Sequence, residues 1–594
     1  MKKLLLMLCL AFTASAARAG KADTRPIIVT QTDGTKLTIL GFGDEHFNWY
    51  TTTDGVILAH VGYSYYVANI DGAGNITPSA QLAHEPSERS AAERTLVKAQ
   101  NKKAFFSPSA TRAHHSRMRR IGIDNHSIPY FPHTGSPKAP VLLVQFADVK
   151  FSSTDPKRSF NDYMNAQGAL TAYDMAEDRN HGSVRQYFSD MSNGTFTPQF
   201  DVIGPVTVSK KSTYYGEGSM EAGSRIYEMI NEACDKAHQL TNLSTYDANH
   251  DGLIDGVYII FAGFSESIGG NSTDDIWPKA GVVPTGLQRT FGTVKAARFA
   301  MSSERNYNPS YAAKKPPYKH ICGVGLFCHE FSHTLGLPDT YSNIPEDNQE
   351  MEYWDLMDNG EYTDNGFTPT PYTPWEKETM GWIKIDTLRN IEKVTLNPGD
   401  YCKIISETSN EYLILENLQK TGWAKKMLGH GMLVYRIDYP YSTVNMTDLP
   451  NSTAGKPAIT VVPADGLLMS SYKVHNKDDD APTPQFPYSR KQYIDSHAGD
   501  PYPGTSNITE ILSVRLNNST LQKPIYQIIE RPDSVITFNF LRKDIPAGIA
   551  TLIEEKNNTT DNRVFTIDGR FVGTTTKGLP KGVYIVNKKK IIVR

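Results

Sequence analysis

Two histidines four residues apart, His329 and His333, are the residues of this 594-residue chain whose types and spacing point most directly to chemistry. Side chains at this spacing lie on one face of a helix, so both imidazoles can reach a single metal ion, and neutral imidazole is a good ligand for zinc. Glu330 follows the first histidine, so its carboxylate can reach a water molecule at the metal without being a ligand. This arrangement predicts hydrolysis in which Glu330 serves first as general base and then as general acid.

The residues after His333 can supply a third ligand. Gly336 permits the left-handed turn that ends a helix, so the chain can double back and bring the carboxylate of Asp339 to the same ion. Zinc held by three protein ligands keeps a fourth position for water, which is typical of catalytic rather than structural sites. A chance His-Glu-x-x-His pattern on an ordinary helix is the alternative. Gly336, Asp339 and the small, apolar segment 323–327 before the histidines all argue against it.

A second motif, at residues 354–360, supports the first. It resembles the methionine turn of the metzincin peptidases, in which a methionine, here Met357, packs beneath the metal as an apolar floor and is not a ligand. Together with residues 329–339 it resembles the immune inhibitor A family of secreted zinc metallopeptidases, in which aspartate replaces the third histidine of most metzincins. The resemblance implies an α/β or α+β metzincin-like catalytic domain that holds zinc on the three ligands named above. It also implies hydrolysis of peptide bonds in proteins, with Glu330 as the catalytic residue.

The composition bounds the class of protein. A chain of this length is too long for one domain, and its 39% hydrophobic and 21% charged residues are enough to build several buried cores. The formal net charge of −3 gives no general attraction to nucleic acid or membranes, so we expect no nucleic-acid partner.

Residues 1–19 have the pattern of a secretory signal peptide. Two lysines give a positive start, and an apolar run covers residues 4–12, which is too short to span a membrane as a helix. Small residues mark a cleavage site after Ala19, with a break after Ala16 as the alternative, so Gly20 would begin the exported chain. No later stretch is long and apolar enough to be a transmembrane segment. We therefore expect a protein that is secreted or attached to the cell surface.

Residues 20–120 alternate short strands with turns and are typical of a separate β-rich unit. Residues 44–54 are similar to the prodomain of the immune inhibitor A family, so we interpret this unit as a propeptide that is removed near Arg119 and Arg120. The alternative is an accessory β module that stays attached. No cysteine lies between residues 20 and 231 to cap the zinc, so latency would have to come from an aspartate or a histidine.

The catalytic domain is expected in residues 121–383. The sequence predicts a buried strand at residues 140–146, helices at residues 183–194 and 223–240, and a strand at residues 257–261. Strands mixed with helices on both sides of the zinc helix favour an α/β or α+β fold.

A second metal site is predicted just before the last of these strands. Oxygen-bearing side chains at alternate positions, with Gly252 after the third, form the first half of a calcium loop, because calcium prefers several carboxylate and carbonyl oxygens. The loop departs from an EF-hand, because Tyr258 stands where a glutamate is expected and a strand follows in place of a helix. The alternative is an Asx-rich turn without metal. The predicted ligands are the side chains of Asp247, Asn249, Asp251 and Asp255 and the backbone carbonyl of Leu253.

Residues 384–545 carry short strands at the spacing of a β-sandwich, so we expect a β-rich accessory domain. Parts of it resemble the β-rich region that follows the catalytic domain in the same family. Beyond the signal peptide the chain has four cysteines, which allow three pairings that the sequence cannot choose among. Cys322 and Cys328 flank the start of the zinc helix and either pair or remain buried thiols.

Residues 546–594 form a last β unit. The strand, turn and strand around Asp568, the run at residues 581–586 and the basic end resemble the C-terminal sorting domain of type IX secretion cargo. The resemblance implies the type IX secretion machinery as a partner and a Gram-negative source of the Bacteroidetes type. The alternative is a small β domain that caps the chain.

These patterns together predict a secreted zinc-dependent endopeptidase that acts on proteins or peptides, with calcium as a second cation. One rival is a non-catalytic surface adhesin whose metal centre only holds the fold, and another is a glycan-directed binding protein that uses the downstream β region. The intact ligands and Glu330 favour the enzyme, because a metal site that no longer catalyses a reaction would commonly have lost its general base. No pattern in the sequence identifies the preferred peptide bond.

Overall fold

The computed structural model divides the chain into two compact units, one that ends at Asp544 and one that begins at Ile545. The expected signal peptide and the expected processing site at Arg119 and Arg120 lie outside the described residues. The described residues are 20–24, 26–44, 47–61, 64–107, 109–110, 128–168, 170–171, 179–216, 222–269, 275–306, 320–342, 351–440, 444–475, 486–545, 564–567, 571–586 and 589–593.

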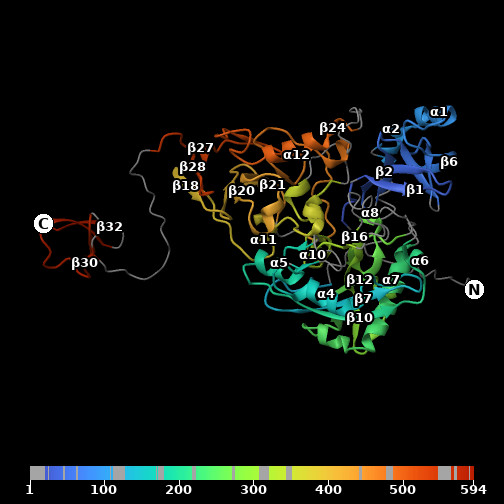
Figure 1. Ribbon diagram of the computed structural model, residues 1–594. Helices are drawn as coiled ribbons and strands as arrows, with labels where there is room; N and C mark the ends of the chain where they lie inside the picture. Colours follow the sequence, from blue (N-terminus) through green and yellow to red (C-terminus); the bar gives the residue numbers. More distant parts are fainter. Residues whose placement is uncertain are drawn as a thin grey trace, which may run out of the picture. The chain divides into compact units, whose positions relative to one another are not determined.

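The first unit begins with an antiparallel sheet of six strands, which are neighbours in sequence order (Figure 1, blue). Two short helices follow the sheet, α1 (Ala91–Ala99) and α2 (Lys102–Phe105). Helix α1 begins after Ser90, whose side chain accepts a hydrogen bond from the Glu93 backbone N–H. The structure agrees here with the strand-and-turn pattern of the sequence. The strands are β1 (Ile27–Thr30), β2 (Lys36–Gly43), β3 (Asn48–Thr52), β4 (Ile57–Val61), β5 (Ser64–Ile70) and β6 (Ile76–Leu82).

A mixed sheet with the strand order β10-β7-β12-β16-β13 forms the middle of the unit. Strands β10, β7, β12 and β16 are parallel to one another, and β13 is an antiparallel edge strand. The expected strand at residues 257–261 is central in this sheet, and its run of apolar residues is typical of a strand buried on both faces. The bounds are β7 (Lys138–Gln145), β10 (Gln199–Thr207), β12 (Val257–Phe264), β13 (Lys279–Val282) and β16 (Arg298–Asn306), with β17 (His320–Ile321) paired to β16.

Helices cover both faces of this sheet, so the fold is a mixed α/β arrangement. Because successive side chains of a strand point to opposite faces, Val141 and Leu143 of β7 enter one hydrophobic core and Leu142 and Val144 enter another. The first core contains residues of α4 (Pro156–Asn165), α5 (Val184–Met191) and α10 (Val324–Thr334), and the second contains α7 (Ala222–His238). Helix α10 carries the predicted ligands, so the site belongs to the first core.

The downstream region has two further sheets, β18-β28-β27 and β19-β20-β21-β22. Their strands share a core of their own, which agrees with the sandwich-like pattern of the sequence. Helix α12 (Arg490–Gly499) is an element that the strand pattern did not predict, and it begins with a capping box made by Ser489 and Gln492. The strands are β18 (Glu392–Leu396), β19 (Tyr401–Ile405), β20 (Tyr412–Leu418), β21 (Gly431–Ile437), β22 (Ile459–Val461), β27 (Ile525–Glu530) and β28 (Ile536–Phe540).

The downstream sheet also completes the core of the catalytic region. In β20, Leu413 and Leu415 face the downstream core, whereas Ile414 lies in the core that contains α10. Trp423 packs against Tyr187 of α5 with ring centroids 5.0 Å apart and donates a hydrogen bond from its indole N–H to Asp190 at 2.9 Å. One hydrophobic core therefore crosses the boundary expected at residues 383 and 384.

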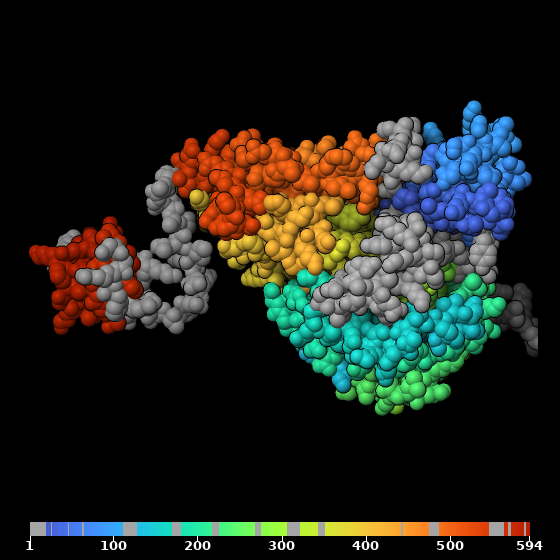
Figure 2. Space-filling model, in the orientation of Figure 1, coloured from blue at the N-terminus to red at the C-terminus, as the bar shows by residue number. Residues whose placement is uncertain are grey.

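Aromatic side chains join the N-terminal sheet to the downstream region. Phe42 stacks on Phe486 with ring centroids 5.6 Å apart, and Trp49 stacks on Tyr472 at 5.9 Å. On the face shown in Figure 2, the blue N-terminal residues lie beside the orange downstream residues. The N-terminal sheet is thus packed onto the rest of the unit.

The second unit is a four-stranded sheet with the order β30-β29-β31-β32. The sequence pattern predicted strands here but not their order. All four cysteines beyond residue 20 are buried free thiols, so Cys322 and Cys328 do not pair. No helix within the described ranges is long and apolar enough to cross a membrane. The strands of this unit are β29 (Val564–Thr566), β30 (Phe571–Gly573), β31 (Gly582–Val586) and β32 (Lys589–Val593).

Candidate active site

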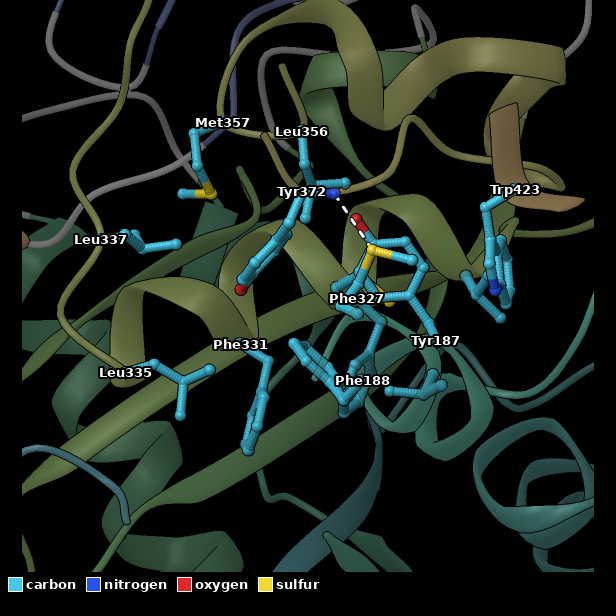
Figure 3. Packing of buried hydrophobic residues seen from close by; sticks show 14 of the residues in the cluster. Tyr187, Phe188, Phe327, Phe331, Leu335, Leu337, Leu356, Met357, Tyr372 and Trp423 are labelled. Carbon is cyan, nitrogen blue, oxygen red and sulfur yellow. Dashed lines mark hydrogen bonds between the residues drawn. The ribbon is translucent and has the colours of Figure 1, made fainter. Parts of the chain in front are cut away.

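Helix α10 is buried along its whole length, from Val324 to Thr334. A helix that is buried on all sides lies inside a core, and here aromatic side chains surround it. Phe331 meets Phe188 with ring centroids 5.3 Å apart, and Phe327 stacks on Tyr258 of β12 at 3.6 Å. Figure 3 shows Phe327, Phe331, Phe188 and Tyr187 gathered below the helix. The packing holds the ligand-bearing helix in one position.

Glycines let a second segment approach α10 closely. A Cβ on Gly325 would lie 2.0 Å from the Glu361 carbonyl oxygen, and a Cβ on Gly323 would lie 2.1 Å from the Gly366 carbonyl carbon. Only glycine fits at either position. The segment 351–366 therefore lies directly against the helix, backbone to backbone.

The three predicted ligands converge on one point. The Nε2 atoms of His329 and His333 are each 3.3 Å from Oδ1 of Asp339, and all three side chains are completely buried. Gly336 has φ of +104°, so the left-handed turn predicted after the helix is present and brings Asp339 back toward the histidines. In the described part of the chain, this is the only group of three such ligand atoms that lie within 4.8 Å of one another.

Backbone carbonyls fix the orientation of both imidazoles. Nδ1 of His329 donates to the Leu356 carbonyl at 2.9 Å, and Nδ1 of His333 donates to the Leu337 carbonyl at 2.7 Å. A carbonyl can only accept, so the proton is on Nδ1 and the lone pair of each Nε2 is free for a metal. The carbonyl of Met357, which is fully buried, accepts from the Thr340 N–H at 2.9 Å. Residues 356 and 357 thus hold both the first histidine and the segment after Asp339.

The charges of the site require a cation. Among the described residues, neither Nε2 atom nor either carboxylate oxygen of Asp339 has a hydrogen-bond partner, although all are buried. Burial alone would raise the pKa of Asp339, and positive charge at the two imidazoles holds that pKa well below its usual range. Three acceptors aimed at one another are stable only with positive charge between them. Two imidazole nitrogens and one carboxylate form a donor set that suits zinc.

Comparison with known proteins agrees with this geometry. Residues 132–384 match the sequence model of the immune inhibitor A peptidase M6 catalytic domain. This part of the chain, here called the M6 domain, is identified by that similarity. The matched range contains all three ligands, Glu330 and Met357.

Two relatives show how far the likeness extends. The chain is 25% identical over 278 residues to immune inhibitor A of Bacillus thuringiensis subsp. alesti, which covers 41% of this chain and 39% of that protein. It is 26% identical over 222 residues to the pre-pro-metalloprotease PrtV of Vibrio cholerae serotype O1, which covers 33% of this chain and 23% of that protein. The alignments therefore span less than half the length of either relative.

Glu330 lies in the M6 domain beside the ligands and is fully buried. Its Oε1 accepts a hydrogen bond from the backbone N–H of Gly20 at 3.0 Å, and its Oε2 has no partner among the described residues. Burial raises the pKa of Glu330 well above its usual range, and the neighbouring carboxylate of Glu361 adds to the effect against the opposing charge of His329. A carboxylate in such surroundings is a stronger base than one in water.

Three acidic residues of the site were missed from the sequence. Glu361 is fully buried with neither oxygen hydrogen-bonded within the described structure, and burial raises its pKa to about 8. Glu352 and Asp358 are also buried, on either side of Met357. The only signal was that acidic residues are frequent around the methionine turn, which by itself predicts a solvated loop.

Two tyrosines near the site, Tyr372 and Tyr362, have different surroundings. The hydroxyl of Tyr372 contacts Ser332 of α10, and its ring packs against Tyr187 and Trp382 in the core. The hydroxyl of Tyr362 donates to the backbone carbonyl of Lys21 at 2.6 Å. Tyr372 is therefore a packing residue, whereas Tyr362 reaches the N-terminal segment that lies at Glu330.

The predicted calcium loop lies elsewhere in the M6 domain, before β12. Its carboxylates accept backbone hydrogen bonds: Asp247 from the N–H groups of Asp251 and Gly252, at 3.1 and 3.0 Å, and Asp255 from that of Ala248 at 3.2 Å. Burial raises the pKa of Asp255, and the charges of Asp247 and Asp251 raise it further. Both a calcium loop and an Asx-rich turn have such bonds, so calcium binding stays a prediction.

Proposed function

We propose that this protein is a secreted zinc-dependent endopeptidase that hydrolyses peptide bonds in proteins, with Glu330 as general base. The observation that carries the proposal is the convergence of two imidazole nitrogens and one carboxylate, all buried, beside a fourth group that can move protons. The M6 match supports the reaction class. The order of the central sheet, with an antiparallel edge strand, supports the metzincin-like assignment.

The residues of the site divide the reaction between them. Zinc held by His329, His333 and Asp339 would polarise the peptide carbonyl and acidify the attacking water. Glu330 accepts the proton of that water and then donates it to the nitrogen of the leaving amine. The Gly20 nitrogen, 3.0 Å from Glu330 Oε1, marks a position where such a nitrogen can lie. The backbone carbonyls bonded to the two histidines keep their Nε2 atoms pointing at the ion.

An extended substrate has a place to bind along β13. This strand is at the edge of the sheet and pairs only with β16 among the described strands, so its other side can add one more strand. A peptide bound in this way would continue past the site in both directions. The arrangement therefore favours an endopeptidase over an enzyme that removes single terminal residues.

The N-terminal unit is proposed to be a propeptide that keeps the enzyme latent. Its first described residues, Gly20 and Lys21, lie in the site, and the Gly20 N–H is bonded to Glu330. A general base that is already hydrogen-bonded, in a cleft filled by the chain itself, cannot receive a substrate. Processing near Arg119 and Arg120 would free it. The alternative, a β module that stays attached, does not explain why Gly20 is buried at the catalytic carboxylate.

Removal of the metal tests the proposed function. The purified chain is cut at its basic stretch with trypsin, the trypsin is inhibited, and casein digestion is measured. A chelator that prefers zinc to calcium, such as 1,10-phenanthroline, is expected to lower the rate at least ~100-fold, and zinc is expected to restore it. Metal analysis is expected to find zinc in the untreated protein. Zinc-free protein that digests casein at the full rate would contradict the proposal.

Calcium is proposed for the loop of Asp247, Asn249, Asp251, Leu253 and Asp255. Binding would offset the repulsion among its carboxylates, so added calcium is expected to raise the melting temperature. The variant Asp251→Ala is expected to lose this increase and keep its zinc. An equal increase in the variant and in the unchanged protein would remove this site from consideration.

The other proposals rest on sequence. The resemblance of residues 546–594 to a type IX sorting domain supports export through that machinery. A non-catalytic adhesin or a glycan-directed protein remains the rival function, and the casein measurement separates it from the peptidase. Neither rival accounts for the intact, buried Glu330 beside the ligands.

A further inference from the structure

Lys21, which follows the Gly20 bonded to Glu330, is a completely buried lysine. The side chain of Lys21 has no exposed surface, and its Nζ lies 3.4 Å from Oδ1 of Asp358 and 3.8 Å from Oε1 of Glu352. The ring of Tyr472 lies beneath the ammonium, with its centroid 4.4 Å from Nζ. Lysine is almost never fully buried unless it is paired, so this pocket supplies the partners that the charge needs.

The two carboxylates of the pocket are held in place by groups other than Lys21. Oε2 of Glu352 accepts hydrogen bonds from the hydroxyl of Tyr493 at 2.6 Å and the side-chain amide of Asn359 at 2.7 Å, and Oε1 accepts from the Ser471 N–H at 2.8 Å. Oδ2 of Asp358 accepts from the Glu352 N–H at 2.6 Å. Each carboxylate is therefore held by protein donors and does not depend on Lys21 for its position.

The backbone of Glu352 is strained to make this pocket. Its φ is +54°, a left-handed conformation that costs a non-glycine residue about 1 kcal/mol or more. Strain of this kind tends to be kept where a side chain must be aimed at a ligand. The pocket also holds two acids for one ammonium. Burial and the charge of Glu352 raise the pKa of Asp358 to about 7, and Lys21 opposes them.

The main chain around Lys21 is held by hydrogen bonds, three of them to residues outside the N-terminal unit. The Gly20 carbonyl accepts from the indole N–H of Trp277 at 3.0 Å, and the Lys21 carbonyl accepts from Tyr362 at 2.6 Å. The Ala22 N–H donates to Gly43 at 2.7 Å and the Asp23 N–H donates to Ser267 at 3.0 Å. Trp277 lies two residues before β13, the edge strand proposed to bind substrate. The segment therefore occupies the cleft with a basic side chain in a side pocket.

We propose that Asp358 and Glu352 form a subsite that selects substrates with a lysine or arginine side chain, and that Lys21 fills this subsite in the latent chain. The inference rests on the proposed peptidase function and adds the substrate class. The Gly20 nitrogen lies at Glu330, where the leaving amine belongs, and Lys21 is the next residue. Gly20 then stands for the first residue after the cut bond, so the subsite takes the second.

Mapping of cut sites tests the inference without any variant. The trypsin-cut, trypsin-inhibited chain of the casein experiment is given a peptide library, and the cut positions are read by mass spectrometry. Lysine and arginine are expected at the second position after the cut at least ~10-fold more often than norleucine, the uncharged analogue of lysine. Cleavage with no basic preference at this position overturns the subsite but keeps the peptidase. A wild-type protein that cuts no peptide overturns the proposed function itself.

Matched variants locate the preference in the pocket. Asp358→Asn and Glu352→Gln are each expected to lower kcat/KM for a lysine peptide at least ~10-fold and to leave kcat/KM for the norleucine peptide within about twofold. The control is Glu416→Gln, another buried carboxylate, bonded to Tyr435 at 2.7 Å in β20 and outside the pocket. It is expected to change neither value. An equal loss on both peptides in the two pocket variants would mean that these acids only support the fold, and the inference would fail.

Discussion

Replacing Glu330 with glutamine is expected to lower kcat for casein-derived peptides by about 10²–10⁴-fold while zinc stays bound. Glutamine has almost the same shape and can still accept the hydrogen bond from Gly20, but it cannot take a proton from water. The three ligands are untouched, so the metal content is expected to equal that of the unchanged protein. Steady-state kinetics and metal analysis on the same preparation provide the measurement.

The control for this experiment is again Glu416→Gln, which removes a buried carboxylate at a distance from the ligands. It is expected to keep full activity. A Glu330→Gln protein that cleaves at the wild-type rate would contradict the assigned role. Loss of zinc from that variant would indicate that Glu330 is a ligand. The converging group of ligand atoms does not include Glu330, so we do not expect this result.

A chain cut back to residues 121–383 is expected to be insoluble or unfolded. Ile414, Leu433 and Tyr435 of the downstream sheet are buried in the same core as α10, so the shorter chain would expose their apolar partners to water. Burial of one large apolar side chain contributes about 1.5–3 kcal/mol, and several such losses equal the whole stability of a typical domain. Circular dichroism and thermal unfolding of the soluble fraction are the measurements.

The comparison for the shortened chain is one that ends at residue 544, where the first compact unit ends. It keeps both downstream sheets and is expected to unfold cooperatively near the temperature of the full chain. If the 121–383 chain were soluble and showed a cooperative thermal unfolding transition, the downstream sheet would not be needed to stabilise the core that contains α10.

The sequence predicted the parts of the site that depend on local rules. A four-residue spacing places His329 and His333 on one face of a helix, and Gly336 ends that helix with positive φ, as its type predicts. The buried strand of residues 257–261 could be found because strands buried on both faces have continuous apolar runs. The resemblance to the immune inhibitor A family was confirmed for residues 132–384.

The parts that were missed depend on contacts between distant residues. Glu330 and Gly20 are 310 positions apart, and nothing near either one indicates that they meet. Lys21 had the pattern of an ordinary charged residue after a signal peptide, because its partners come from segments more than 300 residues away. The shared core was missed because β20 alternates apolar residues on both faces, and periodicity does not show which core each face enters.

The two glycines at the start of α10 have a consequence for how this domain can vary. Alanine at Gly325 would meet the Glu361 carbonyl at 2.0 Å, so the segment 351–366 would have to move outward as a body. That movement would carry Glu361, Asp358 and Glu352 away from α10 together. The distance between α10 and the segment 351–366 is therefore set by the absence of a Cβ at Gly323 and Gly325. We therefore expect related sequences to vary at the three acidic positions more than at the two glycines.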